Sequence, residues 1–131
     1  MEMAIQETAG LGSSIKTRAP IDVLTENGYT IVRKSDLDPT VLDSARDCRF
    51  LVRDSNNDER EIKVAFNETT IALVNELRPT PLRAESSFWV CCAEQHLATY
   101  LWQMDEDPAD GSLVIDSLPP EDLKLASTWS G

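Results

Sequence analysis

The stretch RFLVRDSNNDEREIKVAF, residues 49–66, carries the clearest strand pattern in the chain. Apolar and polar side chains alternate on both sides of the polar segment 54–58, which is typical of two antiparallel strands joined by a turn. One face of this hairpin is expected to pack on a core, and the other to carry cross-strand ion pairs. The buried face is predicted to consist of Phe50, Val52, Ile62, Val64 and Phe66, and the exposed face of Arg49, Arg53, Glu61 and Lys63.

Working outward from the hairpin, residues 29–33 predict a third strand and residues 113–115 a further short one. On the N-terminal side, a short helix is expected to begin at Pro20 and to end at Asn27-Gly28. A second short helix is expected to begin at Asp38-Pro39 and to run to about Ala45. Residues 1–18 lack a sustained apolar period and are expected to form a flexible N-terminal arm.

Three helices are predicted after the hairpin. Asn67 is a favourable N-cap for a helix that continues to about Arg78, before Pro79 and Pro81. The longest helix should begin at Ser86 or Ser87 and reach about Met104, with apolar residues spaced by three or four around a wide arc. A last helix is expected from about Pro119 onward.

This order of elements is α+β rather than alternating βαβ. The expected architecture is a small antiparallel sheet of three or four strands, with helices packed on one face. A chain of 131 residues with 41% hydrophobic and 27% charged residues is typical of one globular domain. The prediction is therefore an arm over residues 1–18 followed by a single α+β domain over 19–131.

The composition also restricts localisation and partners. The longest apolar run, residues 88–93, is far shorter than a bilayer requires, and residues 1–12 lack the pattern of a secretory signal. The cysteines are Cys48, Cys91 and Cys92, an odd number with two adjacent, which favours reduced thiols and a cytoplasmic protein. No membrane association is expected.

The formal net charge is −11, and Lys124 is the only Lys or Arg beyond Arg83. A surface with so few cations cannot neutralise several phosphates, so direct nucleic-acid binding is not expected. The arginines and lysines near the hairpin alternate with acidic residues and are interpreted as a solvated face. A partner protein with a basic surface fits this charge better.

Two patterns could indicate chemistry, and both are incomplete. Cys92 and His96 lie four residues apart on the longest predicted helix, so they share a face and could pair as thiolate and imidazolium. Residues 105–111 are similar to a calcium-binding loop, but the position of the bidentate glutamate is occupied by Ser117. We therefore predict no catalytic residue, no cofactor and no resident metal.

The function expected from the sequence is a small, non-catalytic adaptor or regulatory protein that binds another protein through its acidic, aromatic C-terminal half. Exposed aromatic residues beside acids are candidates for such contacts. Phe88 and Trp89 are consecutive in a helix, so they are not expected both to face the same core. Partial burial beside Pro79 to Pro81 is the favoured interpretation, and an exposed Trp that contacts a partner is the alternative. The candidate partner-binding residues are Phe88, Trp89, Trp102, Asp105, Glu106, Asp107 and Asp110.

Two alternative functions remain open at this point. One is a thiol-dependent enzyme that uses Cys92 with His96. The other is an acidic decoy that mimics nucleic acid and occupies a nucleic-acid-binding site on its target. The adaptor hypothesis is favoured because the acids concentrate in one loop and two helix starts, whereas a decoy needs phosphate-like charges over a long surface.

Overall fold

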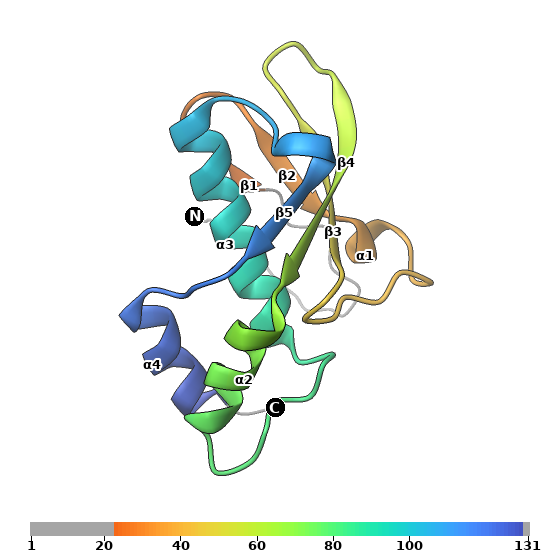
Figure 1. The fold of residues 1–131 in the computed structure, drawn as a ribbon. Coiled ribbons are helices and arrows are strands. Elements are labelled where there is room, and N and C mark those ends of the chain that lie inside the picture. The colour runs from red at the N-terminus through yellow and green to blue at the C-terminus, as the bar shows by residue number, and fades with distance from the viewer. Residues whose placement is uncertain (1–22, 130–131) are drawn as a thin grey trace, which may run out of the picture.

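The computed structural model describes residues 23–129 and shows an α+β fold with one open sheet of five strands (Figure 1). The strands lie in the sheet in their sequence order. They are β1 (Val23–Leu24), β2 (Thr30–Arg33), β3 (Cys48–Arg53), β4 (Glu59–Phe66) and β5 (Ser112–Ile115). The helices are α1 (Lys34–Leu37), α2 (Glu68–Glu76), α3 (Ser87–Met104) and α4 (Pro120–Thr128), with a 3-10 turn, η1 (Ala109–Gly111), before β5.

The predicted hairpin is confirmed as β3 and β4. The two strands pair antiparallel, with Phe50 opposite Ile62 and Arg49 opposite Lys63. All five residues predicted on its inner face are at most 2% exposed. On the outer face, the Arg49 guanidinium lies 2.9 Å from the Glu61 carboxylate, so the expected cross-strand ion pair is present.

The prediction of three or four antiparallel strands is wrong in two details. A fifth strand is present because Val23 and Leu24, expected in a helix, pair antiparallel with β2. The sheet is mixed because β5 pairs parallel with β4. A parallel pair needs a long crossover connection, and α2 and α3 between these two strands provide one.

The helix predicted over 38–45 does not form. The single turn of α1 ends at Leu37, and Asp38 instead accepts hydrogen bonds from the backbone N–H and the hydroxyl of Thr40. Asp side chains often compete with helical hydrogen bonding in this way. The expected helix start at Pro20 and the expected arm over residues 1–18 lie outside the described residues.

The two helices after the hairpin begin where their caps predict. The Asn67 side chain accepts a hydrogen bond from the Thr70 N–H at 2.8 Å and caps α2. Ser86 caps α3 in the same way through the Phe88 N–H. Arg78, just after α2, donates to the backbone carbonyls of Ala126 and Trp129 and so ties α2 to the C-terminal end of α4.

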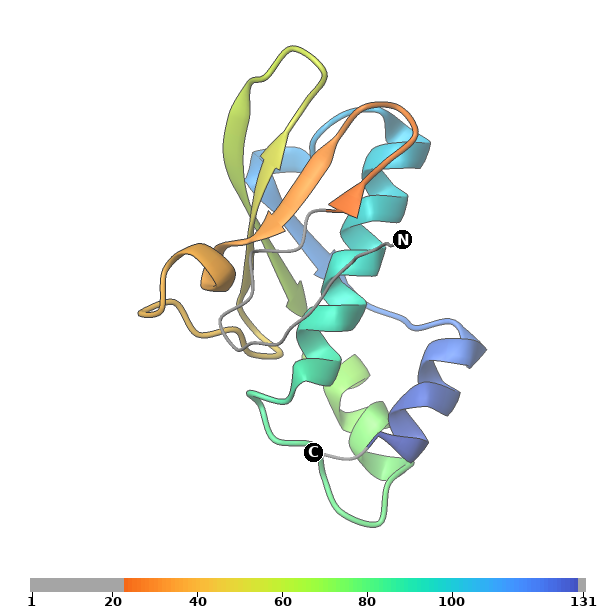
Figure 2. The ribbon, with the colours of Figure 1, turned by 180° about the vertical axis from the view of Figure 1, so that it is seen from behind.

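Helix α3 is the centre of the core. It packs across one face of the sheet and contacts β2, β3, β4 and β5, while α2 and α4 contact each other beside its N-terminal half (Figures 1 and 2). Seven of its residues are buried: Phe88, Trp89, Val90, Cys92, Ala93, Leu97 and Leu101. Among residues 23–129, no helix combines the length and apolarity needed to cross a bilayer.

Candidate functional site

The two aromatic residues at the start of α3 are both buried. Phe88 is 0% exposed and Trp89 is 1% exposed, so the expectation that they do not both face the core is wrong. The rings stack edge to face, with centroids 5.2 Å apart. Phe66 of the sheet covers Trp89, and Trp129 after α4 covers Phe88. Because α3 is covered on two sides, side chains about 100° apart can both reach the core.

Trp102, near the other end of α3, is the aromatic residue that remains open to solvent. Its residue surface is 52% exposed, and that of Leu24 is 71% exposed. Both residues line a shallow hollow of about 350 Å³, together with Glu26 and Ala98. We call the residues Leu24, Glu26, Ala98, Trp102, Asp105 and Glu106 the Trp102 surface. An exposed tryptophan beside an exposed leucine is typical of a protein contact site.

Asn27 holds the acidic end of α3 beside the turn between β1 and β2. Its side-chain amide donates to the Leu101 carbonyl at 3.0 Å and to the Asp105 carboxylate at 3.1 Å. Asp105 has a left-handed backbone with φ of 52°, which ends the helix. These hydrogen bonds explain how Leu24 and Trp102, far apart in the sequence, come to line one hollow.

The acids predicted at the site do not act as one cluster. Asp107 binds the Arg60 guanidinium through two hydrogen bonds of 2.6 and 2.8 Å, and Arg60 also contacts Asp54. Asp105 and Glu106 are exposed just after α3, whereas Asp110 lies in η1. The structure brings Trp102 and Asp105 together through Asn27 and places Phe88 and Trp89 elsewhere. We leave the two buried aromatic residues out of the proposed surface.

The carboxylates of this region affect a buried phenol nearby. Burial raises the pKa of Tyr29, and the negative charges of Asp105 and Asp107 raise it further, although Arg60 opposes them. This effect indicates a negative local field in spite of the Arg60 ion pair. Sequence reasoning missed Leu24 and Glu26, because their neighbours on α3 are more than 70 positions away in the chain.

Cys92 lies in an environment that opposes thiolate formation. Its residue is 2% exposed, and burial raises its pKa to about 12, with the charges of Asp122 and Cys91 adding to the rise. The His96 ring approaches a different group, since its Nε2 atom lies 3.3 Å from the Asp122 carboxylate. A nucleophilic cysteine needs a lowered pKa, so we do not base the proposed function on Cys92.

The exposures of the thiols predict their order of alkylation. Cys48 and Cys92 are buried, whereas Cys91 is partly exposed beside Arg33. Under native conditions with iodoacetamide, we expect Cys91 to react first, and Cys48 and Cys92 to react at least about tenfold more slowly. Mass spectrometry of peptides from timed samples measures this order. Modification of Cys92 as fast as Cys91 would contradict the structure and favour the thiol-enzyme alternative.

Over residues 23–129, no three His, Cys, Asp or Glu side chains converge in a way that could hold a metal ion. In the loop predicted to resemble a calcium site, Asp105 faces Asn27 and Asp107 faces Arg60. These partners direct the two carboxylates to different groups.

Comparisons of this chain with protein-family models, with curated proteins and with solved structures found no match.

Proposed function

We propose that this protein is a non-catalytic adaptor or regulator that binds a partner protein through the Trp102 surface. The observation that supports the proposal most strongly is the pairing of Trp102 and Leu24, both more than half exposed, around one hollow. Tryptophan is among the residues that contribute most to binding energy in protein interfaces. The hollow next to it offers a place for an apolar side chain of the partner.

The charges around the hollow support a partner with basic residues at its rim. Glu26 lines the hollow, Asp105 is joined through Asn27 to the backbone of Trp102, and Glu106 follows it in the chain. The nearby cation Arg60 is occupied by Asp54 and Asp107. Opposite charges at the rim of an interface mainly speed association and select the partner, whereas a desolvated aromatic centre contributes most of the affinity. We therefore infer that the acidic residues select the partner and speed its association, and that Trp102 contributes most of the binding affinity.

The alternative of a nucleic-acid-mimicking decoy predicts a different dependence on charge. A decoy should lose its target when duplex DNA or RNA is added, and 0.5 M salt, where the Debye length is under about 5 Å, should abolish its binding. An adaptor that binds through an apolar centre should retain its target under both conditions. The exposed apolar pair at the Trp102 surface favours the adaptor.

The replacement Trp102→Ala is expected to lower the affinity for the partner protein about tenfold or more, because it removes the aromatic centre of the interface. Glu106→Gln should lower it less, and mainly by slowing association at low salt. Surface plasmon resonance with the immobilised partner separates these two effects.

Leu42→Ala is the matched control, since Leu42 is 78% exposed and lies outside the Trp102 surface. It should leave the affinity unchanged. An equal loss for Leu42→Ala and Trp102→Ala, or binding that both 0.5 M salt and competing nucleic acid abolish, would exclude the proposal.

A further inference from the structure

Strand β5 forms one edge of the sheet and has a free side. It is the last strand in the order and pairs only with β4 among the described strands. The Asn67 N–H donates to the Ile115 carbonyl at 3.0 Å, so the backbone groups of Ile115 point toward β4. Because the direction of these groups alternates along a strand, the N–H and C=O of Val114 point away from the sheet.

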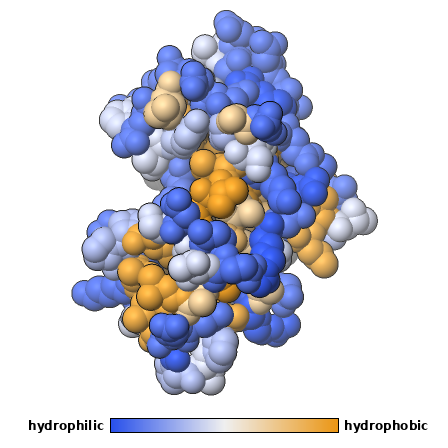
Figure 3. Space-filling model, viewed as in Figure 1, coloured by the Kyte–Doolittle hydropathy of each residue, from blue (hydrophilic) through white to orange (hydrophobic). Residues whose placement is uncertain are grey.

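Apart from its short length of four residues, this edge lacks the features that usually prevent further strand pairing. Exposed edges are commonly protected by a lysine, a proline or a bulge within the strand. The sequence of β5 is Ser-Leu-Val-Ile, and Val114 is 59% exposed. The space-filling view shows an apolar area in the middle of this face, over β5 (Figure 3). Within residues 23–129, no backbone hydrogen bond to the outward groups of Val114 is found.

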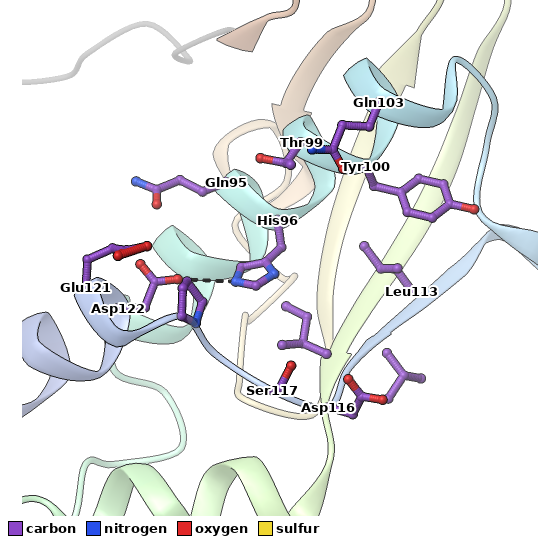
Figure 4. Close-up of a pocket in the computed structure, with 13 residues that line it drawn as sticks. Gln95, His96, Thr99, Tyr100, Gln103, Leu113, Asp116, Ser117, Glu121 and Asp122 are labelled. Atoms are coloured by element: carbon purple, nitrogen blue, oxygen red, sulfur yellow. Dashed lines mark hydrogen bonds and ion pairs between the residues drawn. The ribbon is translucent and has the colours of Figure 1, made fainter.

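A cavity of about 480 Å³ lies beside the free edge. Helix α3 forms one wall with His96, Tyr100 and Gln103, and the start of α4 forms another with Asp122 (Figure 4). The contact between His96 and Asp122 links these two walls. The space next to the outward backbone groups is therefore bounded by side chains and is not an open, flat surface.

The charge of the cavity is one-sided. Two carboxylates at the start of α4, those of Glu121 and Asp122, line it, Asp116 follows β5 at its margin, and neither Lys nor Arg is among its lining residues. His96 is its only residue that can become a cation, and it already faces Asp122. An occupant with positive side chains would complement this lining.

We propose that the free edge of β5 binds an extended peptide segment of a partner protein, with basic side chains in the adjacent cavity. The segment adds a sixth strand to the sheet, and its backbone exchanges hydrogen bonds with the N–H and C=O of Val114. With about 3.3 Å per residue, the four residues of β5 can pair with roughly four residues of the segment.

The two faces of β5 predict an alternating sequence in the segment. Ile115 is buried and Leu113 is half-buried on the side of α3, so the Val114 side chain lies on the opposite face. Side chains of the segment on the α3 side would enter the acidic cavity, and those on the other side would lie next to Val114. The preferred segment therefore alternates Lys or Arg with an apolar β-branched residue.

A second copy of this chain fits the edge less well. Each copy carries a formal net charge of −11, and charge of one sign on both copies opposes their association. Charge complementarity therefore favours a basic partner segment.

The test uses a fluorescein-labelled peptide with blocked ends, Lys-Val-Lys-Val-Lys-Val, and fluorescence anisotropy with the full chain. Alternate amides of a bound strand point in opposite directions, so only one of the two alternate sets of peptide N–H groups faces β5. We expect N-methylation of that set to lower the affinity at least about tenfold, since it removes edge hydrogen bonds but keeps the charge. Val114→Pro, which removes the outward N–H, should lower the affinity by a similar factor. Trp102→Ala should leave it unchanged, so this result is independent of the Trp102 surface.

Hydrogen exchange provides a second readout that does not depend on the folding of a variant. The Val114 amide should exchange rapidly in the free protein and at least about tenfold more slowly with saturating peptide. Equal binding of the unmodified peptide and both N-methylated forms would mean general attraction to an acidic protein and would overturn the proposal. A Val114 amide that is already protected in the free chain, or a dimer that Val114→Pro dissociates, would show another occupant and overturn it as well.

Discussion

Replacement of Trp89 by alanine is expected to lower the free energy of unfolding by about 3–5 kcal/mol, the usual cost of removing a large buried aromatic side chain. Trp89 is 1% exposed, and Phe66 and Phe88 surround it edge to face. Its indole N–H donates to the Arg83 carbonyl at 3.0 Å, so the replacement also removes a partly buried hydrogen bond at the edge of the core. Urea denaturation followed by circular dichroism measures the change.

Trp102→Ala is the matched control for this prediction. The same residue type on the same helix is 52% exposed at position 102, so its removal should change the free energy of unfolding by less than about 0.5 kcal/mol. Equal destabilisation by the two replacements would show that the assignment of Trp89 to the core and Trp102 to the surface is incorrect.

The second large effect is expected at the ion pair between the sheet and α3. Arg33 of β2 forms two hydrogen bonds of 3.1 and 3.2 Å with the Glu94 carboxylate, and the two side chains are only 25% and 15% exposed. Glu94→Met leaves the Arg33 guanidinium half-buried without its main partner. We expect a loss of about 2 kcal/mol, less than for a fully buried pair because solvent still reaches Arg33.

A double-mutant cycle separates this interaction from general packing effects. Replacement of both Arg33 and Glu94 by Met removes both charges, so it should destabilise the protein clearly less than the sum of the two single replacements. The free energies of unfolding at low salt and at 1 M salt give the coupling. Strictly additive losses would show that the two side chains do not interact in solution.

The hairpin and the two helices after it could be predicted because their signals are local. Alternation identifies the inner face of residues 49–66, and Asn67 and Ser86 mark helix starts through hydrogen bonds to residues two or three positions away. Strand β1 could not be predicted, because two residues have no measurable period and become a strand only by pairing with β2. The parallel pairing of β5 depends in the same way on contacts that follow from the whole fold.

The candidate site was predicted in part for a similar reason. The sequence indicates which residues are aromatic or acidic, and it correctly places several of them on or after one long helix. It does not show which side of that helix the sheet and α4 cover. The sequence alone therefore cannot tell that Trp89 is buried and Trp102 is exposed. Leu24 and Arg60 reach the site through tertiary contacts alone, and no local pattern marks them.

The most direct test of the Trp102 surface as a partner-binding site is site-specific photo-crosslinking. A benzophenone amino acid is placed at position 102 in one sample and, as the matched control, at the exposed position 42 in another. We expect position 102 to give one dominant crosslinked partner and position 42 to give little of it. Excess unmodified protein should suppress the crosslinked product, whereas excess Trp102→Ala protein should not. Equal crosslinking of that partner from both positions, or equal suppression by both competitors, would contradict the proposed function.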